Sequence, residues 1–206
     1  MADNLALSDV SRETMTQLQL YQDLLVKWTS KINLIAPSTI ESSWERHVID
    51  SAQVFKYVPL GALHLVDIGS GGGLPGLVIA ILAKERMPGL AITLIESDQR
   101  KAAFLRTVAR ELDLAVSIKA ERIEAVTDVR ADVLTARALA PLLNLLSYGK
   151  QLLNDDGLAL FQKGKSFQQE ISQARTSWSF DLQEFPSETD DEARILQIKD
   201  IRRVIN

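Results

Sequence analysis

Residues 67–76 read DIGSGGGLPG and hold five of the ten glycines in the chain. They follow the apolar run LHLV at 63–66 and precede the apolar stretch LVIAILA at 77–83. Glycine loses more conformational freedom on folding than any other residue and offers no side chain for packing. So dense a cluster predicts a turn, between a strand and a helix, whose backbone approaches another group closely.

Beyond this turn, short apolar runs rich in β-forming residues alternate with amphipathic stretches. Such alternation is typical of a parallel sheet covered by helices on both faces, and it predicts an α/β fold. Strands are expected at 63–68, 91–96, 115–119, 132–135 and 157–162. Helices are expected at 75–86, with Pro75 in the first helical position, at 99–112 and at 141–153. Two further runs, 180–185 and 195–201, are expected to form an antiparallel pair on one sheet edge.

The first sixty residues are predicted to be helical. The apolar residues that recur at the spacing of one helix face, and so indicate a packing surface, are Leu18, Tyr21, Leu25 and Trp28. A second helix is expected over residues 44–57, capped by Ser38 or Thr39. We therefore divide the chain into an N-terminal helical extension, residues 1–60, and a core at residues 61–206, packed together as a single domain.

The composition excludes several classes of site. The chain has no cysteine, which excludes disulfides, thiol nucleophiles and cysteine-based zinc sites and fits the reducing cytoplasm. Its two histidines are too few for a three-histidine metal site, and no metal is expected. Residues 1–10 carry no basic leader, and the longest apolar run, 74–83, is too short to cross a bilayer.

The turn at 67–76 is placed to hold a nucleoside-containing cofactor, because ligands of open α/β sheets bind beyond the carboxyl ends of the strands. The next strand ends at Glu96, and an acid at that place accepts hydrogen bonds from ribose hydroxyls. Asp67 stands just before the first glycine, where a carboxylate suits an ammonium group, such as that of a methionine moiety, better than a pyrophosphate.

Two other interpretations of the turn stay open. Gly71, Gly73 and Gly76, followed by Glu96, also match the dinucleotide fingerprint of NAD enzymes. The remaining chain offers no second catalytic domain and no evident hydride-handling side chain, so the site features favour S-adenosylmethionine over NAD. A structural glycine turn without a ligand is the third interpretation.

A second stretch, ALFQKGKS at 159–166, is similar to a relaxed phosphate-binding loop. Its leading glycine is absent, and Leu160 and Phe161 are strand formers that provide no backbone nest, which disfavours nucleotide hydrolysis. Lys163 and Lys165 are expected at a strand end, where they either face a polyanion or belong to a solvated turn.

Five motifs together resemble one family of bacterial enzymes. They are RHVIDS at 46–51, DIGSGGGLPG at 67–76, ESDQRKAAFL at 96–105, AERIE at 120–124 and ARALAPL at 136–142. In this order the chain resembles the RsmG (GidB) family, the 16S ribosomal RNA guanine-N7 methyltransferases, over about residues 20–201. The resemblance implies a class I, Rossmann-like methyltransferase fold, S-adenosylmethionine as methyl donor and 16S ribosomal RNA as substrate.

The resemblance also implies a cofactor site. In the family pattern Glu96 holds the ribose, the backbone around Ile123 and Glu124 faces the adenine, and Arg137 closes the pocket. The expected cofactor-binding residues are Asp67, Gly69, Gly71, Gly73, Leu74, Glu96, Ile123, Glu124 and Arg137. The chain departs mildly from the family pattern at Gly72, Leu74 and Ala120.

Methyl transfer to guanine N7 needs no general base, because this nitrogen carries a lone pair and no proton. Alignment of the nitrogen, the methyl group and the sulfur is then the main catalytic requirement. Arg137 and Arg46 are expected to orient and contact the substrate. Arg137 would contact guanine O6 or a phosphate, and the alternative is a strand-end ion pair.

The residues expected to bind RNA are Arg46, His47, Lys163 and Lys165. Arg46 and His47 would line the RNA-facing mouth, although His47 fits a helix-surface or capping position equally well. Asp50 is spaced to pair with Arg46, and His64 is expected to be structural. A basic helix face is expected to be solvated rather than to bind phosphate; it carries Arg100, Lys101, Arg106 and Arg110.

The net charge of −4 predicts modest and strongly salt-dependent affinity for free RNA. The substrate is therefore expected to be 16S ribosomal RNA within a small-subunit particle, where shape adds to recognition. The chain shows no aromatic-rich face that demands an oligomer, so a monomer without membrane contact is expected.

Overall fold

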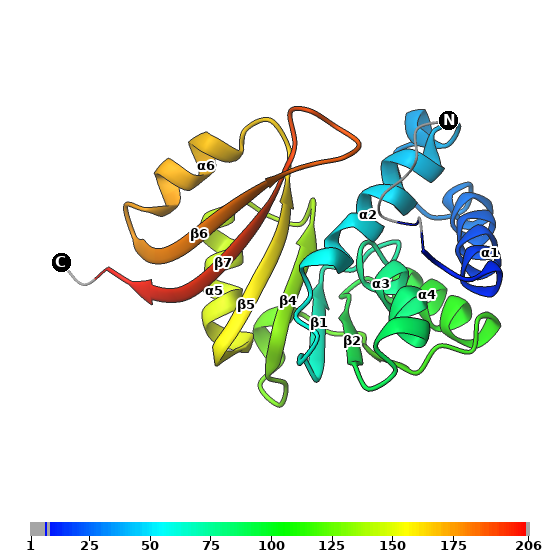
Figure 1. Cartoon of the computed structure of the whole chain (residues 1–206), viewed down its shortest axis with the longest axis horizontal. Helices are drawn as coiled ribbons and strands as arrows, with labels where there is room; N and C mark the ends of the chain where they lie inside the picture. The colour runs from blue at the N-terminus through cyan, green and yellow to red at the C-terminus, as the bar shows by residue number, and fades with distance from the viewer. Residues whose placement is uncertain (1–6, 8, 205–206) are drawn as a thin grey trace.

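A sheet of seven strands lies at the centre of the structure, in the order β3-β2-β1-β4-β5-β7-β6 (Figure 1). The computed structural model describes residue 7 and residues 9–204. The strands are β1 (His64–Ile68), β2 (Ala91–Ile95), β3 (Val116–Lys119), β4 (Ala131–Arg137), β5 (Leu153–Lys163), β6 (Trp178–Pro186) and β7 (Arg194–Arg203). The first five are parallel, whereas β7 runs antiparallel to β5 and β6 antiparallel to β7. The predicted parallel sheet with an antiparallel edge is confirmed.

Helices cover both faces of this sheet (Figure 1). On one face lie α3 (Gly76–Arg86) and α4 (Gln99–Glu111), and on the other lie α5 (Leu142–Leu152) and α6 (Phe167–Ala174). Neighbouring residues of β1 point to opposite faces, so that Leu65 joins the apolar cluster of α3 and Val66 that of α5. Burial on both faces is why the strands read as continuous apolar runs.

Three elements differ from the expected pattern. Helix α6 is not anticipated, because its packing face has only three apolar residues over two turns, Phe167, Ile171 and Ala174. Strand β5 begins at Leu153, directly after α5, and its residues 154–156 are polar and exposed. Pro75 is the cap of α3 and not its first residue.

The N-terminal extension begins with α1 (Arg12–Thr29), whose cap Ser11 accepts a hydrogen bond from Thr14 N at 3.1 Å. The face predicted to pack is buried, with Leu18 and Leu25 in the same apolar cluster as Leu77 of α3. Figure 1 shows α1 beside α3 and α4. The extension thus shares its apolar cluster with the sheet.

The second helical segment covers residues 44–57 as predicted, but it changes its winding. It is π-helical over Trp44–Ile49, α-helical over α2 (Asp50–Ala52) and 3₁₀-helical over Gln53–Tyr57. The expected cap is absent there, because Pro37–Thr39 form a separate 3₁₀ turn. The segment reaches the loop between β6 and β7, where Gln53 Nε2 donates to Ser187 Oγ at 3.0 Å.

Within residues 7 and 9–204, no helix combines the length and the hydropathy needed to cross a membrane. Residues 1–6, 8, 205 and 206 lie outside the described part of the chain. The absence of a signal peptide was predicted from residues 1–10, most of which are among these residues.

Candidate functional site

The glycine-rich loop turns sharply between β1 and α3. Gly69, Gly71 and Gly73 have φ angles of 63°, 54° and 85°, a region that residues with a side chain disfavour. Backbone hydrogen bonds close the turn, from Ser70 N to Ile95 O at 3.1 Å and from Gly73 N to Ser70 O at 2.6 Å. Backbone conformation therefore requires three of the five glycines.

Close packing requires the other two. A Cβ atom on Gly72 would lie 2.9 Å from Cδ1 of Leu25 on α1. A Cβ atom on Gly76 would lie 2.4 Å from Cδ2 of Leu94 on β2. The backbone of this loop was predicted to approach another group closely. At Gly72 and Gly76 that group is the protein itself, namely α1 of the extension and β2 of the sheet.

Tyr21 ties the N-terminal extension to this loop. Its side chain is fully buried, and its hydroxyl donates a hydrogen bond to the carbonyl oxygen of Gly72 at 2.7 Å. Burial raises the pKa of the phenol, so the hydroxyl stays protonated and acts as a donor. The helical spacing indicates only a packing face for Tyr21, although its hydroxyl is the one polar group among Leu18, Leu25 and Trp28.

Glu96 follows β2 directly and is 8% exposed. Its carboxylate accepts hydrogen bonds from Gly71 N and from Asp98 N, both at 2.8 Å. Asp98 caps α4 and accepts a hydrogen bond from Arg100 N at 2.8 Å. The backbone of two loops therefore fixes the Glu96 carboxylate beside the glycine turn.

A cavity of about 260 Å³ opens beside Glu96. The predicted cofactor residues that line it are Gly69, Gly71, Glu96, Ile123 and Glu124. The hydroxyl of Tyr148, on α5, donates to Glu124 Oε1 at 2.8 Å, and the amide of Glu124 itself and this hydroxyl lower the pKa of the carboxyl. The cavity fits a nucleoside. The Glu96 carboxylate can accept hydrogen bonds from ribose hydroxyls, and it lies between the glycine turn and the backbone of Ile123 and Glu124.

Three further residues, Leu139, Tyr148 and Lys101, line the cavity and were not predicted to do so. Leu139, in the turn after β4, lies over Gly69, where a Cβ atom would stand 2.4 Å from its Cδ1. Tyr148 was not singled out. Lys101 lines the cavity and does not belong to a wholly solvated helix face. Leu139 lies within the motif ARALAPL and Lys101 within ESDQRKAAFL, but neither motif marks these side chains as cofactor contacts, and Tyr148 lies outside all five motifs.

Three predicted cofactor residues lie beneath the cavity and do not line it. Asp67 is fully buried, and its Oδ1 accepts a hydrogen bond from Thr135 Oγ1 at 2.7 Å. Burial raises the pKa of Asp67 to about 6, while the Thr135 hydroxyl acts in the opposite direction. Leu74 is buried in the apolar cluster of α3, and a Cβ atom on Gly73 would meet Leu77 of that helix.

Arg137, at the end of β4, points away from the cavity beside Glu96. Its Nη1 donates to Asp50 Oδ2 and to Arg46 O, both at 3.0 Å. Its Nη2 lies 2.9 Å from His47 Nδ1. The side chains of Arg137 and Asp50 are each 16% exposed, so this is a largely buried ion pair. Asp50 thus pairs with Arg137, and the expected pairing with Arg46 is wrong.

His47 departs from the expectation of an RNA-facing or surface position, since it is 9% exposed with both ring nitrogens engaged. The guanidinium of Arg137 only donates, so Nδ1 accepts from it, and Nε2 donates to Thr39 Oγ1 at 2.7 Å. Burial, with Arg137 next in size, lowers the pKa of His47 to about 4. The ring is neutral and connects the end of β4 to the turn at Pro37–Thr39.

The other basic residues divide into engaged and exposed ones. Lys163 is 10% exposed, lies 2.6 Å from Glu170 Oε2 and donates to Ala140 O at 3.0 Å, so its charge is already neutralised. Lys165 and Arg46 are exposed. Residues 159–163 belong to β5, which agrees with the argument against a phosphate-binding loop.

His64 is structural, as expected. Its Nδ1 lies 2.8 Å from Arg130 O and its Nε2 lies 2.9 Å from Thr93 Oγ1. Elsewhere on the basic helix face, Arg100 and Arg110 are exposed and lie near Asp98 and Glu111. These arginines agree with a solvated surface.

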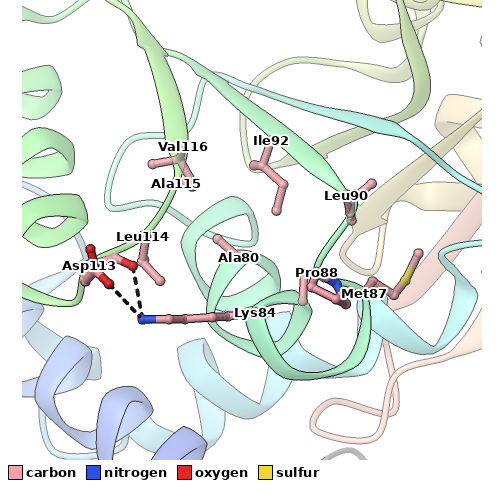
Figure 2. Close-up of a pocket in the computed structure, with 11 residues that line it drawn as sticks. Ala80, Lys84, Met87, Pro88, Leu90, Ile92, Asp113, Leu114, Ala115 and Val116 are labelled. Carbon is pink, nitrogen blue, oxygen red and sulfur yellow. Dashed lines mark hydrogen bonds and ion pairs between the residues drawn. The ribbon is translucent and has the colours of Figure 1, made fainter.

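Figure 2 shows a different cavity, of about 350 Å³, at the amino-terminal ends of β2 and β3. Its walls are mostly apolar, with Ala80, Ile92 and Val116 among them. Lys84 bonds there to the carbonyl oxygen of Asp113 at 3.0 Å and so is not free to act on a ligand. Because ligands of such sheets bind at the carboxyl ends of the strands, this cavity is not the functional site.

The parallel order β3-β2-β1-β4-β5, the antiparallel edge, the glycine turn after β1 and the acid after β2 define one class. The protein is an S-adenosylmethionine-dependent methyltransferase. Solved structures of similar fold include the ribosomal protein L11 methylase from Lactobacillus delbrueckii subsp. bulgaricus. It is 20% identical, with a TM-score of 0.57 over 78% of this chain and 80% of that chain. A mutant of MtNAS in complex with S-adenosylmethionine is 16% identical, with a TM-score of 0.59 over 90% of this chain and 75% of that chain.

Sequence relatives narrow the class to one family. The family model described as rRNA small subunit methyltransferase G (GidB) matches residues 14–195. Proteins named ribosomal RNA small subunit methyltransferase G are similar along nearly their whole length. The one from Ruegeria sp. (strain TM1040) is 49% identical over 95% of both chains, and that from Gluconobacter oxydans is 44% identical over 97% of this chain and all of the other. The chain belongs to the rRNA small subunit methyltransferase G family.

Proposed function

We propose that this enzyme transfers the methyl group of S-adenosylmethionine to N7 of a guanine in 16S ribosomal RNA. The carrying observation is that Ala138, which follows β4 at the carboxyl edge of the sheet, lines two cavities. The first is the cavity beside Glu96, and the second, of about 200 Å³, is lined by Arg137 and Gln162. In this proposal the methyl donor occupies the first cavity and the acceptor base the second, with Ala138 in the wall of each. The names of the relatives support ribosomal RNA as the substrate.

The first cavity holds the cofactor in this proposal. Glu96 accepts hydrogen bonds from the ribose hydroxyls, and the backbone of Ile123 and Glu124 borders the adenine. The turns at Gly69 and Gly71 border the rest of the molecule. When bound, S-adenosylmethionine supplies an electrophilic methyl group on a positively charged sulfur. Asp67, Gly73 and Leu74 act from beneath the cavity, as supports of the loop.

The acceptor chemistry needs orientation more than proton transfer. Guanine N7 forms a bond to the methyl carbon with its lone pair while the bond from that carbon to sulfur breaks, and the electron pair of the broken bond stays on sulfur. The base becomes positively charged, and no proton moves at N7. The task of the protein is therefore to hold N7 in line with the methyl group, which is a contribution of proximity and orientation.

Arg137 is a positioning residue in this proposal. It joins Asp50 and His47 of the extension to the end of β4, next to Ala138, which lines both cavities. Its bond to Arg46 O also fixes the backbone from which the exposed Arg46 side chain extends. Arg46 and Lys165 are the exposed members of the predicted RNA-binding set, and we assign them to RNA phosphates.

We infer that the working substrate is a small-subunit particle and that the enzyme acts as a cytoplasmic monomer. The net charge of −4 opposes tight binding to bare RNA. Lys163, a third predicted contact, is already paired with Glu170, which leaves less positive charge for phosphates. Recognition of shape in a particle compensates for that weak attraction.

The test incubates the enzyme with isotope-labelled S-adenosylmethionine and small ribosomal subunits from cells that lack the endogenous activity. Nucleosides are then separated by mass spectrometry. One labelled 7-methylguanosine is expected, with slower transfer to protein-free 16S ribosomal RNA. Transfer to another nucleoside, or none with cofactor binding intact, overturns the acceptor. Binding of NAD in place of S-adenosylmethionine would return the loop to the dinucleotide interpretation.

A further inference from the structure

We propose that Glu170 of α6 is a positioning residue, which acts together with Lys163 to hold the turn that lines both cavities. The inference rests on the proposed function and adds to it a residue far from the extension. The turn, residues 138–141, follows β4 and precedes α5. Ala138 lines both cavities, and Leu139 lines the first of them. The position of this turn therefore shapes the space for the methyl donor and the space for the acceptor.

The backbone of this turn has a conformation that its sequence does not favour. Ala138 has a φ angle of 51°, in the left-handed region that residues with a side chain disfavour. Such a conformation persists only where the surrounding structure fixes it. The next residue is Leu139, whose Cδ1 lies 2.4 Å from the position that a Cβ atom on Gly69 would take. A small shift of the turn would therefore move Leu139 against the cofactor loop or away from it.

Two side chains fix the end of the turn that leads into α5. Lys163, the last residue of β5, donates from Nζ to Ala140 O at 3.0 Å. Glu170 Oε2 accepts from the amide of Leu142, the first residue of α5, at 2.8 Å. Lys163 Nζ and the same Glu170 oxygen lie 2.6 Å apart. One ion pair thus attaches the turn to both β5 and α6.

This ion pair is largely buried, which allows positioning to be separated from stability. The side chains of Lys163 and Glu170 are 10% and 18% exposed. Removal of one member leaves a buried charge uncompensated, whereas replacement of both by apolar side chains of similar volume is often neutral for stability. If the pair served stability alone, cofactor affinity and methyl transfer would recover with stability in the double replacement. If the pair positions the turn, they stay low.

The experiment compares Glu170→Met, Lys163→Met and the double variant, because methionine is similar in length and carries no charge. Urea unfolding, the calorimetric affinity for S-adenosylmethionine, and kcat and KM for small-subunit particles are measured for each. Glu170→Met is expected to unfold at a lower urea concentration and to bind the cofactor several-fold more weakly. Its kcat is expected to fall about tenfold, since the reacting groups lose their alignment. The double variant is expected to recover most of the stability but neither the affinity nor kcat.

Two further variants are matched controls. The Ser166 hydroxyl donates to Glu170 Oε1 at 3.1 Å, on the oxygen that does not bond to the Leu142 amide. Ser166→Ala is therefore expected to keep the wild-type affinity and kcat. Glu170→Gln keeps one oxygen that can accept from Leu142 N and Lys163 Nζ, so it is expected to retain more affinity and kcat than Glu170→Met.

Several outcomes would overturn the inference. They are recovery of affinity and kcat with stability in the double variant, wild-type affinity in Glu170→Met, and an equal loss in Ser166→Ala. A raised KM for particles with unchanged kcat in Lys163→Met would instead make Lys163 an RNA contact. If Glu170→Met does not fold, the double variant and Glu170→Gln decide between the two roles.

The calorimetric measurement does not depend on the acceptor. Failure of the wild type to methylate a guanine overturns the proposed function, and the cofactor affinities of the variants still decide whether Glu170 positions the turn.

Discussion

The hydroxyl of Tyr21 donates a 2.7 Å hydrogen bond to the carbonyl oxygen of Gly72, 51 positions further along the chain. The bond joins α1 of the N-terminal extension to the back of the glycine turn, whose Gly69 and Gly71 border the cavity beside Glu96. Leu25 of the same helix fills the space that a side chain at Gly72 would need. The extension therefore supports the cofactor loop directly.

Tyr21→Phe is expected to weaken binding of S-adenosylmethionine several-fold, because the turn loses its anchor. The variant also leaves the Gly72 carbonyl buried without its donor, at a cost of about 1–3 kcal/mol in the free energy of unfolding. Isothermal titration calorimetry and urea unfolding measure the two effects. Tyr57→Phe is the control, since Tyr57 of the same extension stacks on Phe185, away from the glycine turn. Equal affinities of the two variants would contradict the role of Tyr21.

Glu96→Gln is expected to reduce the affinity for S-adenosylmethionine more than tenfold. A carboxylate accepts from Gly71 N and Asp98 N with both oxygens, whereas the amide turns an NH₂ group against one of these donors. Glu121→Gln removes a charge from the same cavity without touching the glycine turn and serves as the control. Comparable loss in both variants would mean that charge alone matters, against the geometric argument.

Gly69→Ala and Gly71→Ala separate backbone strain from steric overlap. Both glycines have positive φ, so each substitution costs about 1–2 kcal/mol of stability. Only at Gly69 does the new Cβ meet a side chain, Leu139 Cδ1 at 2.4 Å. We expect Gly69→Ala to lose more affinity for the cofactor than Gly71→Ala, with partial recovery in the Gly69→Ala, Leu139→Ala double variant. Calorimetry of the three variants checks this, and equal affinities of the two single variants refute it.

Removal of Arg137 is expected to lower both stability and activity. Arg137→Ala leaves Asp50 without its ion-pair partner in a largely buried place, at a cost of about 3–5 kcal/mol in urea unfolding. Methyl transfer is expected to fall at least tenfold, because the turn at Ala138, which lines both cavities, loses its attachment to the extension. A double-mutant cycle with Asp50→Asn is expected to give a coupling energy of about 1–3 kcal/mol. Wild-type turnover in Arg137→Ala, or additive costs in the cycle, would refute the positioning role.

Stability is expected to fall on acidification through His47. The pKa of this ring is about 4 in the folded protein and about 6.5 in the unfolded chain. Between these values the unfolded state binds more protons, so the contribution is complete above pH 6.5 and is lost as the pH falls towards 4. Asp67, whose pKa is raised to about 6, acts in the opposite direction over a similar window, since there the folded state binds more protons.

The comparison of wild type with His47→Asn isolates the histidine from that opposing effect. The asparagine oxygen can still accept from Arg137 and does not titrate. From pH 7 to pH 5 the wild type is expected to lose about 1–2 kcal/mol more of its free energy of unfolding than the variant. Urea unfolding at the two pH values measures the difference. Identical losses would mean that the ring is protonated in the folded state, against the hydrogen bond assigned from Arg137.

The positions of the strands and of the glycine turn were predictable from the sequence. Burial on both faces requires a run of apolar residues, and a left-handed backbone favours glycine. Apolar runs marked β1 to β5, and glycine density marked the loop. Helix α6 is too short for its three apolar residues to stand out, and the first residues of β5 are polar and exposed, so neither could be predicted from the apolar pattern. Glu96 could also be predicted to lie at the site, because it is the acidic residue that directly follows the apolar run of β2.

Side-chain contacts between segments that are distant in sequence could not be predicted in this way. His47 and Lys163 were predicted to contact RNA. In the structure His47 is hydrogen-bonded to Arg137, and Lys163 forms an ion pair with Glu170. Tyr21 was predicted only to pack against the core, and in the structure its hydroxyl also donates a hydrogen bond to the glycine turn. Asp50 was assigned to Arg46 by helical spacing and instead pairs with Arg137, 87 positions away.

The α/β class, the place of the cofactor turn and the acid beside it are predictable from the sequence, because each depends on burial or backbone conformation over a few neighbouring residues. Which charged side chains form ion pairs with one another, and which face the cavities, depends on the three-dimensional arrangement of the elements. The physical reason is that an ion pair or hydrogen bond depends on distance in space, and the fold brings Asp50, Arg137 and Gln162 together from three distant segments.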